Sequence, residues 1–169
     1  TGAAFSFLAG GGMMQVRMLS ETDAWAAGTS AGKEAIGSFY KTTDGGKSWK
    51  KLLKINHGGV KAIDFSPNEN YLVTWSPEGN QADALRIWDL KTGERLRAFE
   101  GARQGHDMGE WPAFRWSYDD RFFARMGEDC IYCYEASTMK LIKDKSDKRT
   151  SVRIQGVRQF FWSPTDAYM

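Results

Sequence analysis

The chain has 169 residues, a length that suits one domain with a hydrophobic core rather than two. Its net charge of +2 excludes a strong, uniform nucleic-acid binder, and no apolar run is long enough to cross a membrane. Two cysteines cannot build a disulfide framework, so we expect a reducing, cytoplasmic location. Aromatic residues make up 14% and glycines number 18, a combination typical of short strands joined by tight turns.

An internal repeat organises the chain. In each unit an apolar residue followed by Ser precedes an aromatic residue by six positions, in the pairs Leu19 and Trp25, Phe65 and Tyr71, Trp116 and Phe122, and Trp162 and Tyr168. The units start 46, 51 and 46 residues apart, and each contains about four short apolar segments separated by turn residues. No segment keeps a helical apolar period beyond three turns. This repeat length and strand number predict the blades of an all-β propeller.

We expect one propeller domain over residues 1–169, with four-stranded blades at about 13–53, 60–99 and 112–154. Residues 157–169 supply part of a fourth blade, which a strand at 3–9 would complete. Two alternatives stay open: a homodimer that completes the ring, and a segment of a larger propeller. The recurring tryptophans should fill the core: Trp25, Trp75, Trp88, Trp116 and Trp162.

From about residue 56 onward the sequence resembles the β-propeller of the b subunit of eukaryotic translation initiation factor three. The residues that carry the resemblance are His57-Gly58-Gly59-Val60, Ile87-Trp88-Asp89, Trp111-Pro112-Ala113-Phe114-Arg115-Trp116-Ser117, Asp120-Arg121-Phe122-Phe123-Ala124-Arg125-Met126 and Trp162-Ser163-Pro164. The resemblance implies a non-enzymatic scaffold whose propeller contacts the small ribosomal subunit and the other subunits of the factor.

The first 55 residues resemble a different class, the Asp-box repeat of photosystem II assembly factors. The resemblance rests on one short box, in which it implies a hairpin turn with a Trp packed between strands: Thr42, Asp44, Gly46, Ser48 and Trp49. Two resemblances in one chain favour a chimeric or engineered protein joined near residues 51–57. The alternatives are an engineered propeller without a native ligand and an Asp-box assembly factor.

The candidates for catalytic chemistry favour structural roles. Cys130 and Cys133 have CxxC spacing but lie in a strand pattern, so their thiols should diverge, one into the core and one outward. His57 should hydrogen-bond a turn rather than transfer protons. The carboxylates of Asp119 and Asp120 fall in a turn, where acidic residues commonly form the turn itself. We therefore expect no enzyme activity, cofactor or metal.

One candidate binding surface remains. Residues 140–169 contain seven basic and three acidic side chains, but no aromatic residue lies between Lys140 and Arg158, which favours a solvated loop or a Lys-protected edge strand over base contacts. We expect protein partners, no membrane and no sequence-specific nucleic acid. The candidate residues come from this segment and from the polar loop at 101–110: His106, Asp107, Lys145, Lys148 and Arg149.

Overall fold

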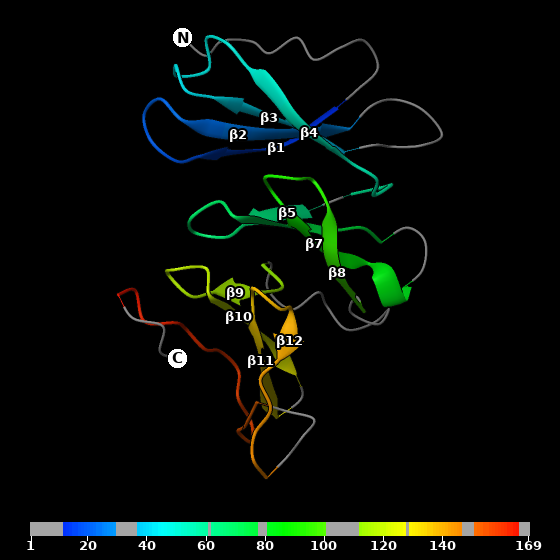
Figure 1. Cartoon of the computed structure of the whole chain (residues 1–169), viewed down its shortest axis with the longest axis vertical. Helices are drawn as coiled ribbons and strands as arrows, with labels where there is room; N and C mark the ends of the chain where they lie inside the picture. Colours follow the sequence, from blue (N-terminus) through cyan, green and yellow to red (C-terminus); the bar gives the residue numbers. More distant parts are fainter. Residues whose placement is uncertain are drawn as a thin grey trace. The chain divides into compact units, whose positions relative to one another are not determined.

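The computed structural model describes residues 12–29, 37–60, 62–77, 81–100, 112–127, 129–146 and 151–165. These residues form three antiparallel sheets, each built from strands that follow one another in the chain (Figure 1). By their contacts the residues divide into two units. The first comprises residues 1–64 and 72–103, and the second comprises 65–71 and 104–169.

The first sheet has the order β1-β2-β3-β4. Its strands are β1 (Gly12–Met18), β2 (Ala24–Thr29), β3 (Gly37–Thr42) and β4 (Lys50–Ile55). Consecutive buried residues at 24–27 show that β2 is covered on both faces. Small alanines flank one Trp there, so a neighbouring layer can approach the strand closely.

The second sheet has the order β5-β6-β7-β8. It contains β5 (Ala62–Phe65), β6 (Tyr71–Trp75), β7 (Leu85–Asp89) and β8 (Arg95–Phe99), with the short 3₁₀ turn η1 (Gln81–Asp83) between β6 and β7. The two inner strands are rich in β-branched and aromatic residues and are largely buried, as their central position requires.

The third sheet follows the order β12-β11-β10-β9, with a further strand beside β11. Its strands are β9 (Arg115–Trp116), β10 (Phe122–Gly127), β11 (Cys130–Glu135), β12 (Lys140–Leu141) and β13 (Val152–Arg153). Both β12 and β13 pair with β11, the former near its end and the latter near its start. Together they form one outer strand in two pieces.

The prediction of an all-β fold of propeller type is confirmed by these three antiparallel sheets, two of four strands and one of five. Residues 157–165 contain no strand, so the partial fourth blade stays a prediction, and its expected partner at 3–9 lies outside the described residues. Phe160 from this segment nevertheless packs into the core of the second unit, against Ala124, Ile131 and Cys133.

Two expectations about the core need correction. Trp25, Trp88 and Trp116 are buried, but Trp75 and Trp162 are only half-buried. Cys130 and Cys133 are both buried and both free, rather than one inward and one outward. The prediction that one Cys points outward assumed a sheet with one solvent-exposed face. The middle strands of the third sheet are instead covered on both faces.

Candidate interaction surface

The repeated Ser builds the same turn twice in the second unit. In the first turn the Ser66 N–H donates to the Tyr71 carbonyl (3.0 Å), and the Tyr71 N–H donates back to the Ser66 hydroxyl oxygen (3.0 Å). In the second turn Ser117 and Phe122 make the same exchange at 2.9 and 3.0 Å. The residue three positions after each Ser has a left-handed backbone, with φ of 56° at Glu69 and 60° at Asp120. The sequence repeat is therefore a repeat of turn geometry.

The two turns are joined by the buried carboxylate of Asp120. Its oxygens accept hydrogen bonds from the Ser66 hydroxyl at 2.6 Å and from the backbone N–H of Asn68 at 3.1 and 3.2 Å. The side-chain amide of Asn70 donates to the same carboxylate at 3.0 Å. Because each bond involves a charged acceptor, the set is stronger than neutral bonds of the same length. Asp120 thus holds the turn at 65–71 to the third sheet.

In both turns the aromatic residue at the end of the turn stacks on a tryptophan of the next repeat. The ring of Tyr71 stacks on Trp116, with centroids 5.1 Å apart and planes 7° apart. Phe122 and Trp162 stand in the same relation at 6.3 Å and 15°. The indole N–H of Trp162 donates to the Arg115 carbonyl at 2.8 Å, whereas that of the buried Trp116 has no hydrogen-bond partner among the described residues.

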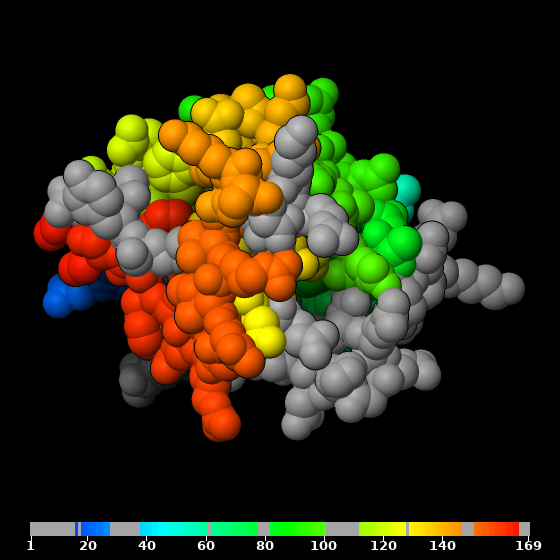
Figure 2. Space-filling view, turned by 90° about the horizontal axis from the view of Figure 1, so that it is seen from below, coloured from blue at the N-terminus to red at the C-terminus, as the bar shows by residue number. Residues whose placement is uncertain are grey.

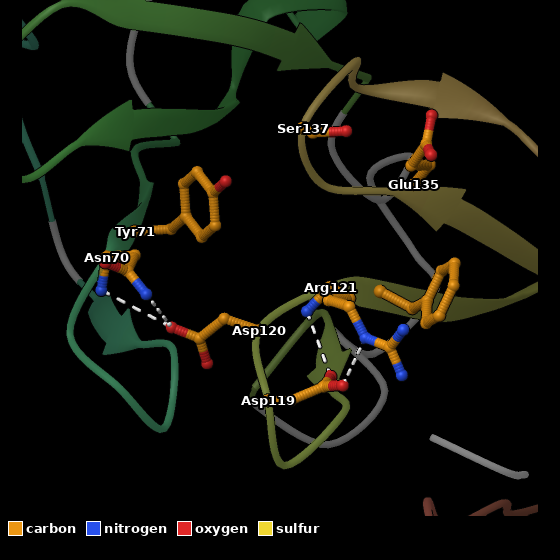
Figure 3. Close-up of a pocket in the computed structure, with 8 residues that line it drawn as sticks. Asn70, Tyr71, Asp119, Asp120, Arg121, Glu135 and Ser137 are labelled. Atoms are coloured by element: carbon orange, nitrogen blue, oxygen red, sulfur yellow. Dashed lines mark hydrogen bonds and ion pairs between the residues drawn. The ribbon is translucent and has the colours of Figure 1, made fainter.

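An open hollow of about 390 Å³ lies at this end of the second unit. Figure 3 shows Tyr71 on one side of it, Glu135 and Ser137 on the other, and the turn that carries Asp119 and Arg121 between them. Asp119 and Arg121 form an ion pair. Although burial raises the pKa of Asp119, hydrogen bonds from Ser117 and Arg121 lower it to about 2. Asp119 is therefore a charged turn former near neutral pH and not a proton donor.

His57 belongs to a buried hydrogen-bond chain in the first unit. The Trp88 indole N–H donates to the Thr74 hydroxyl at 2.8 Å, and the same hydroxyl lies 2.8 Å from His57 Nδ1. Since Thr74 accepts from Trp88, it can donate its own proton to an unprotonated Nδ1. Burial and the positive charge of Arg86 lower the pKa of His57 to about 4. The histidine is thus neutral at pH 7. Its partner is a side chain of β6 and not the turn that the sequence predicted.

The predicted Asp-box residues lie together on the hairpin turn between β3 and β4. Thr42 donates to Asp44 at 2.7 Å, the Ser48 N–H donates to Asp44 at 2.9 Å, and the Trp49 indole donates to the Gly46 carbonyl at 3.1 Å. Hydrogen bonds from the Ser48 hydroxyl and N–H and from Thr42 hold the pKa of Asp44 well below its usual range. These side-chain bonds are local. One backbone bond, from the Gly45 N–H to the Thr22 carbonyl at 2.8 Å, joins the turn to the connection between β1 and β2.

The remaining predicted residues are spread over the chain. Asp89 receives the N–H groups of Lys91 and Thr92 at 2.7 and 2.8 Å and so closes the β7–β8 turn. Lys145 is exposed on the segment after β12. The other candidates lie outside the described residues: His106, Asp107, Lys148 and Arg149.

Sequence reasoning predicted Asp120 only as a turn former and missed its link to Ser66. A signal was available, because an acidic residue occurs three positions after every repeat Ser: Asp23, Glu69, Asp120 and Asp166. Within the described ranges no cluster of His, Cys, Asp or Glu has the arrangement of a metal site. In the same ranges the structure contains no helix of the length and hydropathy that a membrane crossing requires.

Both the sequence and the fold resemble those of known proteins. No protein-family model matches the sequence. The B subunit of eukaryotic translation initiation factor 3 from Aedes aegypti is 42% identical over 122 residues, which is 72% of this chain and 16% of that protein. The B subunit from Xenopus laevis is 42% identical over 123 residues, 71% of this chain and 17% of that protein. The chain thus spans about a sixth of the length of these relatives.

At the level of structure, a crystal structure of a eukaryotic initiation factor superposes with a TM-score of 0.65, covering 95% of this chain and 37% of the other, at 19% identity. That likeness includes nearly the whole chain and supports the propeller fold. The sequence is therefore similar to one region of the B subunit of initiation factor 3, and its three sheets have the fold of a propeller segment.

Proposed function

We propose that the chain is a non-enzymatic β-propeller scaffold that brings proteins together in a translation initiation assembly. The observation that carries the proposal is the 42% identity to the B subunit of initiation factor 3 over 72% of the chain. The geometry supports it. Polar side chains such as Asp120 and His57 form hydrogen bonds that join turns and strands, which is what a rigid display surface requires.

The partners in this proposal are other subunits of the factor and the small ribosomal subunit, and the location is the cytoplasm. The test is a pull-down of purified small ribosomal subunits and of factor subunits with the full chain at low salt. We expect retention of at least one of them. A Trp116→Ala variant, whose core is opened, is the control that should lose binding. Absence of binding by the folded chain would contradict the scaffold proposal.

A chimeric or engineered origin rests only on the sequence pattern of the first 55 residues. Because one initiation-factor structure covers 95% of the chain, the fold of the first sheet requires no second family. The Asp44 turn is compatible with either origin, since its side-chain bonds are local. A homodimer that completes a ring is a separate proposal. Light scattering tests it, with a mass near twice that of one chain in support and a single-chain mass against.

A further inference from the structure

The two pieces of the outer strand of the third sheet are pinned at one residue of β11. The Ile142 N–H donates to the Cys133 carbonyl at 2.8 Å, and the Ser151 hydroxyl accepts from the Cys133 N–H at 2.8 Å. The Ser151 hydroxyl also contacts the Ile142 carbonyl. These bonds fix the points at which the chain leaves this edge of the sheet and rejoins it. The backbone near both points is thereby attached to the sheet, and functional side chains are commonly carried on segments that a scaffold positions in this way.

The described part of this region is strongly basic. We call it the basic edge and define it by five exposed cationic residues at the ends of the interrupted strand and just after it: Lys140, Lys143, Lys145, Arg153 and Arg158. Figure 2 shows the segments of the second unit that carry them, coloured orange to red, with their atoms exposed in that view. Nearby, Asp144 accepts hydrogen bonds from the N–H and the hydroxyl of Ser146.

We propose that the basic edge binds the phosphate backbone of double-stranded RNA without reading its sequence. Cationic side chains spaced along an edge match a polymer with regularly spaced phosphates. No aromatic residue lies between Lys140 and Arg158 to stack on an unpaired base, and the exposed ring of Phe161 just beyond them is already stacked by the Arg115 guanidinium, 5.3 Å from its centroid. This favours a duplex over a single strand. The interrupted strand also offers too short an edge for an acidic peptide to add as a further strand.

The inference names a partner chemistry for the proposed scaffold and rests on that function only for its biological setting. Its test needs no other factor subunit: fluorescence anisotropy of the full chain with a labelled RNA duplex of about 20 base pairs, across a series of salt concentrations. The variant carries Lys140→Glu, Lys143→Glu and Lys145→Glu. A matched control with the same charge change carries Lys50→Glu, Lys54→Glu and Lys91→Glu, three exposed residues of the first unit.

We expect the basic-edge variant to lose about tenfold or more in affinity and to reduce the salt slope of log K by about 2 to 3. The control should stay near the parent protein, and both variants should keep the parent melting temperature. Equal weakening by the two variants, tighter binding of a single-stranded oligo(U) than of the duplex, or equal binding of poly-glutamate would overturn the proposal. Failure here would leave the pull-down with factor subunits unaffected, so the two proposals are separable.

Discussion

The two Ser turns of the second unit have the same backbone conformation. They differ in the residue that accepts the hydrogen bond of the Ser hydroxyl. Ser117 donates to Asp119, two residues away, at 2.7 Å. Ser66 donates to Asp120, 54 residues away, at 2.6 Å. The position of Asp119 is occupied in the first turn by Asn68, which offers no carboxylate. The Ser117 hydroxyl is thus bonded within its own turn, whereas the Ser66 hydroxyl is bonded to a carboxylate of the next repeat.

The division of the chain into two units is consistent with this difference. Residues 65–71 run from the last residue of β5 to the first residue of β6, yet their contacts assign them to the unit of the third sheet. The hydrogen bonds of Asp120 and the stacking of Tyr71 on Trp116 agree with that assignment, because both join these residues to the third sheet. Repeats of this kind gain stability from the interface with the next repeat as well as from their own sheet.

The largest expected effect on stability is at the stacking contact between Tyr71 and Trp116. Replacement of the buried Trp116 by Ala removes the partner of Tyr71 and leaves a cavity, and should lower the free energy of unfolding by about 3–5 kcal/mol. Trp162→Ala, at the half-buried equivalent position, should cost clearly less. Chemical denaturation of both variants measures the difference. Equal losses of unfolding free energy would show that the two tryptophans contribute equally, which would contradict the difference in their burial.

The next effect on stability distinguishes Asp120 from its neighbour Asp119. Asp120→Asn keeps the side-chain shape and the tolerance for positive φ but removes the charge that Ser66, Asn68 and Asn70 share, and should cost about 1–3 kcal/mol. Hydrogen exchange at the Asn68 and Asn70 amides should accelerate. Asp119→Asn affects one exposed turn and should destabilise less, without faster exchange at those amides. If Asp119→Asn alone accelerated exchange at these amides, Asp119 and not Asp120 would be the carboxylate that holds the Ser66 turn.

A tight local contact gives an intermediate effect. A Cβ at Gly127 would meet the Tyr132 ring and would come within 2.8 Å of the Cys130 sulfur. Gly127→Ala should therefore cost about 1–3 kcal/mol, because the surrounding side chains must shift. Gly58→Ala is the control, since no atom lies within 4 Å of its added Cβ. Urea midpoints of the two variants test this, and an unchanged midpoint for Gly127→Ala would contradict the close packing of the β10–β11 hairpin.

The smallest effect at neutral pH concerns the long-range contact of the first unit. The pKa of His57 is about 4 in the folded chain and 6.5 when exposed. Above pH 6.5 the histidine is neutral in both states. As the pH falls from 6.5 to 4 the unfolded chain binds the proton first, so stability should decrease over that window. A His57→Gln variant should lose this part of the pH dependence, whereas His106→Gln should retain it. Equal profiles for the parent and His57→Gln would contradict the buried, neutral histidine.

The sequence predicted what depends on neighbouring residues. The Asp44 hairpin, the Asp89 turn and the four-strand repeat all follow from residues a few positions apart, because turn formation is local. Contacts between distant residues were missed. Asp120 offers the same side chain as Asp119, and only the approach of the Ser66 turn distinguishes them. The burial of both Cys130 and Cys133 was missed for the same reason, since the second covered face belongs to residues far along the chain.

A double-mutant cycle between Ser66 and Asp120 tests the central claim, that a remote carboxylate holds the first turn to the third sheet. Ser66→Ala and Asp120→Gly remove the two partners, and Gly avoids strain at the positive φ of position 120. We predict a coupling free energy of about 1–2 kcal/mol between them. Additive losses, with a coupling within about 0.3 kcal/mol of zero, would show that the Ser66 turn is held by other contacts.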